Sequence, residues 1–187
     1  MYKKLIKVCE KKLDVVLDIR YSTTNNFTGK QIYCKSCCYL NPIAFERLTI
    51  AVEIASKLNL KIKIFDGFRP RESQKKLWEF YPNKNFITPP IKGSPHSRGV
   101  AIDLTLIDEL GRELDMGTEF DEFSNLSFHG SKYISQKAIK NRLLLLGIMT
   151  DSGWDFFRNE WWHYQLFNSK TYPILGDNDL PFILTKD

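Results

Sequence analysis

The sequence predicts an α+β fold in a single domain, with a mainly antiparallel central sheet and flanking helices. Helical periodicity over residues 41–58 is followed by alternation of apolar and polar residues over 60–64, and two further strand-like segments lie at 100–106 and 161–167. This order of helices and short strands is typical of an α+β domain. The 187 residues, of which 43% are hydrophobic, are enough for one domain over residues 1–187 with a proper core.

The N-terminal part is predicted to be irregular before the first long helix. Within residues 13–33, the segment 18–21 is strand-like and 22–29 is a loop by its turn chemistry. Asn41 and Pro42 then predict a helix start, with the asparagine as N-cap and the proline at the first helical position. The residues expected on the buried face of this helix are Ala44, Leu48, Ala51, Val52, Ala55 and Leu58.

The middle of the chain is predicted to lead from a strand through a helix to a stiff loop. Residues 60–64 form a strand with one buried face that ends in the turn 66–70, and a helix follows over 71–81 until a proline stops it. Prolines and a glycine over 89–95 make a stiff loop that leads directly to His96.

The second half is predicted as strand, helix and strand. One face of the strand 100–106 is aliphatic and the other is more polar. A helix begins after Ser135, its predicted N-cap, and ends near Gly147. The last strand runs over 161–167, with His163 on the face opposite the aromatic residues beside it.

Composition and charge argue against several functional classes. The net charge is +5, and the 27 basic and 22 acidic residues are interspersed, so no nucleic-acid partner is expected. The densest basic cluster, within residues 3–12, is interpreted as a solvated helix face. The N-terminus lacks the apolar stretch of a signal peptide, and no apolar run approaches the roughly 20 residues of a membrane span. A cytoplasmic protein without a membrane partner is therefore expected.

Three of the four cysteines cluster at Cys34, Cys37 and Cys38, while Cys9 stands apart. The cluster contains one half of a structural zinc site, but no second pair completes four ligands. Free thiols are the favoured interpretation in a reducing compartment. A second metal site or a redox role is the alternative.

Two short segments carry the strongest chemical signal. His96 and Asp103 lie in one, and Glu160 and His163 lie in the other. Two imidazoles and one carboxylate make the three-ligand set of a catalytic zinc and leave a coordination position for water. Glu160 is placed where a general base would be needed, but residues three apart face opposite sides of a regular strand. Glu160 can therefore reach the metal only if the chain bends before His163.

Five ordered motifs extend this signal over almost the whole chain. They are Asp18-x-Arg20-Tyr21-x-Thr23-x-Asn25-Asn26-Phe27-Thr28-Gly29, Asp66-Gly67-Phe68-Arg69-Pro70, Ser94-x-His96-x-x-Gly99-x-Ala101-x-Asp103, Asp115-Met116-Gly117-Thr118-x-Phe120-Asp121 and Glu160-Trp161-Trp162-His163. The set resembles the hedgehog-like zinc peptidases that include lysostaphin and D-alanyl-D-alanine carboxypeptidases, and more closely the D-alanyl-D-alanine dipeptidases of the VanX type. The cysteine cluster is not part of this resemblance.

The resemblance implies the hedgehog/DD-peptidase-like zinc peptidase fold and hydrolysis of the small dipeptide D-alanyl-D-alanine to two D-alanines. It implies one Zn²⁺ per chain, bound by His96, Asp103 and His163. It also implies that metal-activated water attacks with Glu160 as general base, while Arg69 stabilises the oxyanion. Further substrate-binding candidates are Asp121 for the free ammonium, and Ser94, Tyr21 and Arg98.

Each of these residues also has a simpler interpretation. A lone histidine is more often a hydrogen-bonded core residue, and Arg69 could tie down a turn. Arg98 could be a structural ion-pair partner, and His129 is expected to be an ordinary surface or loop histidine.

The biological role stays open between glycopeptide resistance and recycling of peptidoglycan dipeptide. The rival functions are a peptidoglycan carboxypeptidase or endopeptidase of the same fold, and a non-catalytic zinc-stabilised binding module. A pure binding module needs neither Glu160 nor Arg69.

Overall fold

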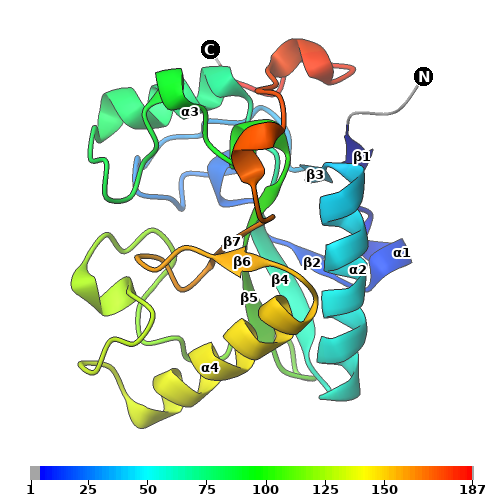
Figure 1. Ribbon diagram of the computed structural model, residues 1–187, viewed down its shortest axis with the longest axis vertical. Coiled ribbons are helices and arrows are strands. Elements are labelled where there is room, and N and C mark those ends of the chain that lie inside the picture. The colour runs from blue at the N-terminus through cyan, green and yellow to red at the C-terminus, as the bar shows by residue number, and fades with distance from the viewer. Residues whose placement is uncertain (1–4, 187) are drawn as a thin grey trace.

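A five-stranded sheet forms the centre of the protein, whose computed structural model describes residues 5–186 (Figure 1). The strand order is β2-β4-β5-β7-β6, and every neighbouring pair is antiparallel except β2 and β4. These strands are β2 (Val16–Leu17), β4 (Lys61–Asp66), β5 (Ala101–Ile107), β6 (Asp155–Phe156) and β7 (His163–Gln165). A separate two-stranded sheet pairs β1 (Ile6–Lys7) with β3 (Tyr39–Leu40). The predicted α+β class with a mainly antiparallel sheet is confirmed.

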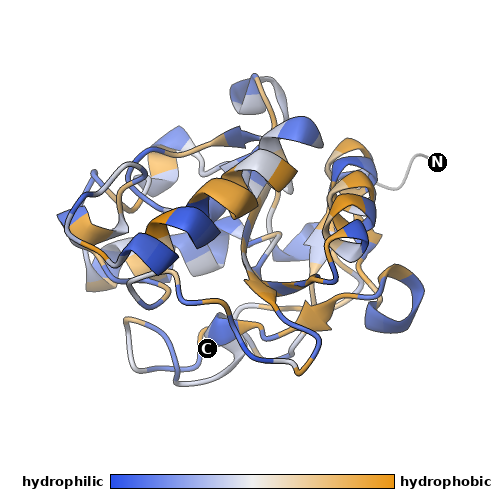
Figure 2. Cartoon of the chain, turned by 90° about the horizontal axis from the view of Figure 1, so that it is seen from below, coloured by the Kyte–Doolittle hydropathy of each residue, from blue (hydrophilic) through white to orange (hydrophobic). Residues whose placement is uncertain are grey.

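Helices cover this sheet and extend beyond its end. Helix α2 (Pro42–Lys57) contacts β4 and helix α4 (Gln136–Asp151), which in turn contacts β6. Helix α3 (Arg71–Phe80) lies on the opposite side of the molecule from α4 (Figure 1). In Figure 2 hydrophobic and hydrophilic residues are mixed along the helices. No helix within residues 5–186 is long and apolar enough to cross a membrane.

The start of α2 follows the prediction. The Asn41 side chain accepts a hydrogen bond from the Ile43 backbone N–H at 3.0 Å, and Pro42 occupies the first helical position. Its predicted buried face is confirmed for Ala44, Leu48, Ala51 and Ala55. Leu58 is instead 48% exposed at the C-cap, beyond the last turn that packs on the sheet.

Several element boundaries differ from the sequence-based expectation, among them the last strand, which spans His163–Gln165 and not 161–167. The prediction of a strand-like segment at 18–21 is wrong, because the strand lies at Val16–Leu17 and Arg20–Ser22 form a 3-10 turn. The hydroxyl of Ser22 fastens this turn to the Ile19 carbonyl at 2.7 Å. Gly147 does not end α4, since the buried Ile148 and Met149 continue its packed face to Asp151. The chain leaves the helix at Gly153, whose φ of 91° suits glycine.

The N-terminal basic cluster does not form one helix face. Lys7 lies in β1, and only Lys11 and Lys12 belong to the short helix α1 (Glu10–Leu13), where both are exposed. Lys3 and Lys4 lie outside the described residues.

Strand β5 is the structural axis on which the rest is arranged. It lies between β4 and β7, and all seven of its residues are buried. The backbone register sets Asp103 of β5 opposite His163 of β7 on one side and opposite Asp66 of β4 on the other. Three polar residues are therefore brought together at one end of the sheet.

We expect Asn41→Ala to lower the free energy of unfolding by about 1 kcal/mol, because an orphan N–H at the start of α2 loses its acceptor. Chemical denaturation measures this change. Asn41→Ser keeps a capping oxygen and should stay near the wild type; equal losses in both variants would contradict the capping role.

Candidate active site and metal centre

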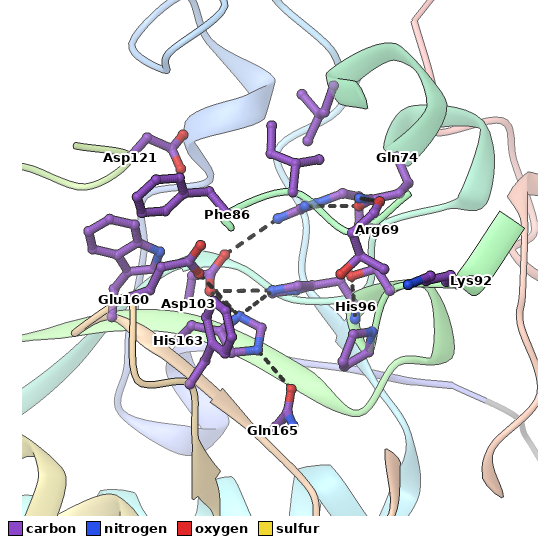
Figure 3. A pocket seen from close by; sticks show the side chains of 18 of the residues that line it. Arg69, Gln74, Phe86, Lys92, His96, Asp103, Asp121, Glu160, His163 and Gln165 are labelled. Atoms are coloured by element: carbon purple, nitrogen blue, oxygen red, sulfur yellow. Dashed lines mark hydrogen bonds and ion pairs between the residues drawn. The ribbon is translucent and has the colours of Figure 1, made fainter. Parts of the chain in front are cut away.

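Three buried side chains converge at the end of the sheet. His96 opens the 3-10 turn His96–Arg98, while Asp103 and His163 face each other across β5 and β7. His163 Nδ1 lies 3.0 Å from His96 Nε2 and 3.1 Å from Asp103 Oδ1. His96 Nε2 lies 3.3 Å from Asp103 Oδ1. The structure therefore brings together the three predicted ligands (Figure 3).

The outer nitrogens of both imidazoles meet oxygen acceptors. His96 Nδ1 lies 2.8 Å from the Gly67 carbonyl, and His163 Nε2 lies 3.2 Å from Gln165 Oε1. These partners assign the ring protons to the outer nitrogens, as in metal sites whose ligands are oriented by surrounding groups. The inner nitrogens then direct two lone pairs toward the Asp103 carboxylate. Such a set of acceptors fits a cation, and two imidazoles with one carboxylate fit zinc.

The position of Gly67 is sterically tight. A Cβ built there would lie 2.5 Å from Cys38 Sγ and 3.1 Å from the Tyr39 carbonyl. The carbonyl that holds His96 therefore comes from a residue that must lack a side chain.

The charge state of the ligands follows from their burial and their proximity. Burial acts to raise the pKa of Asp103, but the neighbouring His96 and His163 outweigh it and lower that pKa below its usual range. Burial also lowers the pKa of His163 and favours the neutral ring. An ionised carboxylate and a neutral imidazole are the forms that bind metal.

Glu160 approaches the ligands because the chain bends before β7. The Glu160 N–H donates to the Phe157 carbonyl, and the His163 N–H donates to the Glu160 carbonyl, so Glu160 sits in a turn rather than in the strand. Its Oε2 lies 3.8 Å from His163 Nδ1. The chain therefore bends between Glu160 and His163, as expected if Glu160 is to reach the metal site. Burial, followed by the charges of Asp103 and Asp121, raises the pKa of Glu160 well above its usual value.

The Arg69 guanidinium is held by three side chains. It donates to Asp66 Oδ2 at 2.8 Å, to Gln74 Oε1 at 3.0 Å and to Asp103 Oδ2 at 3.5 Å. Asp66 in turn accepts from the Tyr33 hydroxyl at 2.9 Å. Sequence analysis missed the positioning contacts of Asp66 and Gln74, although Asp66 belongs to the same short motif as Arg69.

Asp121 forms the acidic end of the site. The Tyr21 hydroxyl lies 3.1 Å from Asp121 Oδ2 and can donate to it. Burial, followed by the charge of Asp103, raises the pKa of Asp121 from 3.8 to about 8.

One cavity of about 270 Å³ is lined by the three predicted ligands together with Glu160, Arg69 and Asp121. Ser94 and Tyr21 also line it, and Lys84, Lys92 and Lys170 stand around it as exposed cations. The apolar part of its wall consists mainly of Phe27, Phe86, Phe123, Phe157 and Trp162.

Comparison with known proteins finds similarity to D-alanyl-D-alanine dipeptidases. The family model for D-Ala-D-Ala dipeptidases among the M15 peptidases matches residues 1–178. A D-alanyl-D-alanine dipeptidase of Escherichia coli is 39% identical over 170 residues, covering 91% of this chain and 88% of that protein. One from Enterococcus faecium is 33% identical over 177 residues, covering 83% and 87%, and one from Streptomyces coelicolor is 30% identical over 170 residues, covering 80% and 84%.

The chain belongs to the D-Ala-D-Ala dipeptidase family. It is a metallo-dipeptidase, and hydrolysis of a dipeptide is its activity. The predicted family is confirmed.

One predicted pocket residue of this dipeptidase lies elsewhere. Arg98 does not line the cavity. Its guanidinium donates to the backbone carbonyls of Tyr172 and Lys92, the latter at 3.2 Å. Arg98 therefore fastens two loops whose lysines reach the cavity, and its recorded partners are carbonyls rather than carboxylates.

His129 and the cysteines lie outside the metal cluster. The His129 ring is partly buried in a turn, with its centroid 5.0 Å from that of Phe156, so His129 is a loop histidine, as expected. Burial lowers its pKa to about 4. All four cysteines are free thiols. Within residues 5–186, His96, Asp103 and His163 are the one group of three side chains close enough to share a metal.

We expect Gln165→Leu to weaken metal binding by roughly 10- to 100-fold, because His163 loses the acceptor that orients its ring. Titration of metal-free protein with zinc against a chelator measures the affinity. Gln165→Glu retains an acceptor oxygen and is the matched control; unchanged affinity in Gln165→Leu would show that Gln165 does not orient the ligand.

We also expect Asp121 to shape the pH dependence of stability in the metal-free protein. Because its folded pKa of about 8 exceeds the ordinary 3.8, its protonated form favours the folded state, and this contribution is lost as pH rises toward about 8. Asp121→Asn should therefore flatten the fall in unfolding free energy between about pH 4 and pH 8. Denaturant titrations across that range that give parallel curves would contradict the expectation.

Proposed function

We propose that this enzyme hydrolyses free D-alanyl-D-alanine to two D-alanines, using one zinc ion, Glu160 and Arg69. The observation that carries the proposal is the meeting of His96, Asp103 and His163 with these two groups in one cavity. The membership of the chain in a dipeptidase family supports the substrate class.

The metal would be held by His96 Nε2, His163 Nδ1 and an Asp103 oxygen. A zinc ion with two neutral imidazoles and one carboxylate supplies Lewis-acid activation of water and of the peptide carbonyl. The Gly67 carbonyl and Gln165 keep both rings oriented for this purpose.

Glu160 acts as the proton carrier. It takes a proton from the attacking water as the new C–O bond forms, and passes it to the leaving amine as the C–N bond breaks. A raised pKa suits this role, because the same carboxyl must accept and then release a proton near neutral pH. Its location in a turn beside β7 fixes the distance to the ligand cluster.

Arg69 stabilises the negative charge that develops on the carbonyl oxygen. A guanidinium keeps its positive charge in a water-poor cavity and presents rigidly arranged donors. Asp66 and Gln74 hold it in place, so little reorganisation is needed during the reaction.

The charges along the cavity suit a zwitterionic dipeptide. Asp121, supported by Tyr21, would bind the ammonium group, and Ser94 and Lys92 would receive the carboxylate. Asp121 and Lys92 lie on opposite sides of the metal ligands in Figure 3. A substrate anchored at both ends places its single peptide bond between them, beside Glu160 and Arg69.

A free dipeptide substrate is compatible with two cellular roles. Depletion of a cell-wall precursor would confer glycopeptide resistance, and recycling would supply D-alanine as a nutrient. We propose a cytoplasmic location for either role, because both consume free dipeptide.

We expect zinc-loaded protein to release D-alanine from D-alanyl-D-alanine, and Glu160→Gln to lower kcat by roughly 100- to 10,000-fold while zinc stays bound. Release of D-alanine and zinc content are measured on the same samples. N-acetylated and C-terminally amidated dipeptides serve as controls for the two charged ends and should be poor substrates.

Cleavage of stem peptides in preference to the free dipeptide would favour the carboxypeptidase or endopeptidase alternative. Full zinc occupancy without hydrolysis of any peptide in the panel would favour a binding module.

A further inference from the structure

A buried arginine on α4 donates hydrogen bonds to the loop that carries Asp121. Arg142 is 4% exposed, and the groups that accept its hydrogen bonds are uncharged. Its guanidinium donates to the Met116 carbonyl at 2.6 Å, to the Leu126 carbonyl at 2.8 Å and to the Phe128 carbonyl at 3.1 Å. Burial lowers its pKa to about 10. A cation buried at this cost, with its donors directed at residues 116–128, indicates that the shape of this loop matters.

The same loop is joined to the turn that carries Glu160. Thr118 Oγ1 accepts from the Trp161 indole N–H at 2.8 Å and lies 3.4 Å from Arg142 Nη2. The Trp161 backbone N–H donates to the Ser127 carbonyl at 3.0 Å, and the Ser127 hydroxyl lies 3.2 Å from that of Thr118. One threonine oxygen therefore joins helix α4, the loop and the turn before β7.

Thr118 and Trp161, which form this junction, each lie close in sequence to a carboxylate of the site. Asp121 follows Thr118 by three residues, and Trp161 follows Glu160 directly. Asp121 also has a φ of 63°, an uncommon conformation for a residue with a side chain. The Thr118 junction ties the loop that carries Asp121 to the turn that carries Glu160.

We propose that Thr118, anchored by Arg142, is a positioning residue that fixes Asp121 relative to Glu160. This inference rests on the proposed function, in which Asp121 binds the substrate ammonium and Glu160 carries the proton. Thr118 acts through these two residues and does not touch the substrate. Its loss should affect ammonium binding and proton transfer together.

The test compares three variants of the zinc-loaded enzyme. Thr118→Val keeps the shape of the side chain but removes the acceptor, and Thr118→Ser keeps the acceptor. Thr150→Val is the matched control, since Thr150 is an exposed helix residue whose hydroxyl donates to the Leu146 carbonyl at 2.7 Å. We expect Thr118→Val to lower kcat/KM for D-alanyl-D-alanine by roughly 10- to 100-fold, with KM raised and kcat lowered, as for small displacements of reacting groups. Thr118→Ser and Thr150→Val should remain near the wild type.

A second measurement reports on the junction without reference to activity. The indole N–H of Trp161, assigned with Trp161→Phe, should exchange slowly with solvent in the wild type and faster in Thr118→Val. Zinc content and unfolding midpoints are recorded for each variant. If Thr118→Val fails to fold, Trp161→Phe removes the same hydrogen bond from the donor side and should change KM and kcat in the same directions.

The outcomes separate the two proposals. An inactive wild type overturns the proposed function. An active wild type whose KM and kcat are unaffected by Thr118→Val, or by Trp161→Phe where the valine variant does not fold, overturns the positioning role alone. Unchanged indole exchange in Thr118→Val overturns the junction itself.

Discussion

The antiparallel pairing of β5 with β7 is the constraint on which the site depends. It sets Asp103 directly opposite His163, so two ligands are placed by backbone hydrogen bonds rather than by flexible loops. The same central strand pairs with β4, which ends at Asp66, the carboxylate that holds Arg69. The proposed metal ligands and the proposed oxyanion-binding group are thus both positioned by one buried strand, and a shift in its register would displace both.

Around this strand the charges are balanced locally. Arg69 forms ion pairs with both Asp66 and Asp103. Asp103 also belongs, with His96 and His163, to the group of side chains that could hold a metal cation. Within residues 5–186, no lysine or arginine forms an ion pair with Glu160 or Asp121, and burial raises the pKa of both carboxyl groups. The groups proposed to stay charged are paired, and those proposed to exchange protons or to bind an ammonium lie in an environment that disfavours their charged forms.

The sequence was most informative where function and local spacing coincide. The motifs located the metal ligands, Glu160 and Arg69, and the Asn41 cap located the start of α2. The roles of these site residues remain proposals that the geometry supports. Residues outside the motifs carried no such signal: Gln74 reaches Arg69 from the start of α3, and Arg142 reaches a loop distant in the sequence from α4. Arg98 was grouped with the pocket on the strength of the resemblance, yet its side chain extends from the 3-10 turn to loop carbonyls.

The arrangement of lysines around the cavity has a consequence for the kinetics of encounter. Lys84, Lys92 and Lys170 are exposed, whereas Asp103 and Glu160, which line the same cavity, are buried. The three ammonium groups attract the anionic end of a dipeptide and orient it before contact. Such guidance extends over roughly 8–10 Å at ordinary ionic strength. Added salt therefore weakens the capture of substrate from dilute solution while leaving the chemical step, sheltered in the buried cluster, largely unchanged.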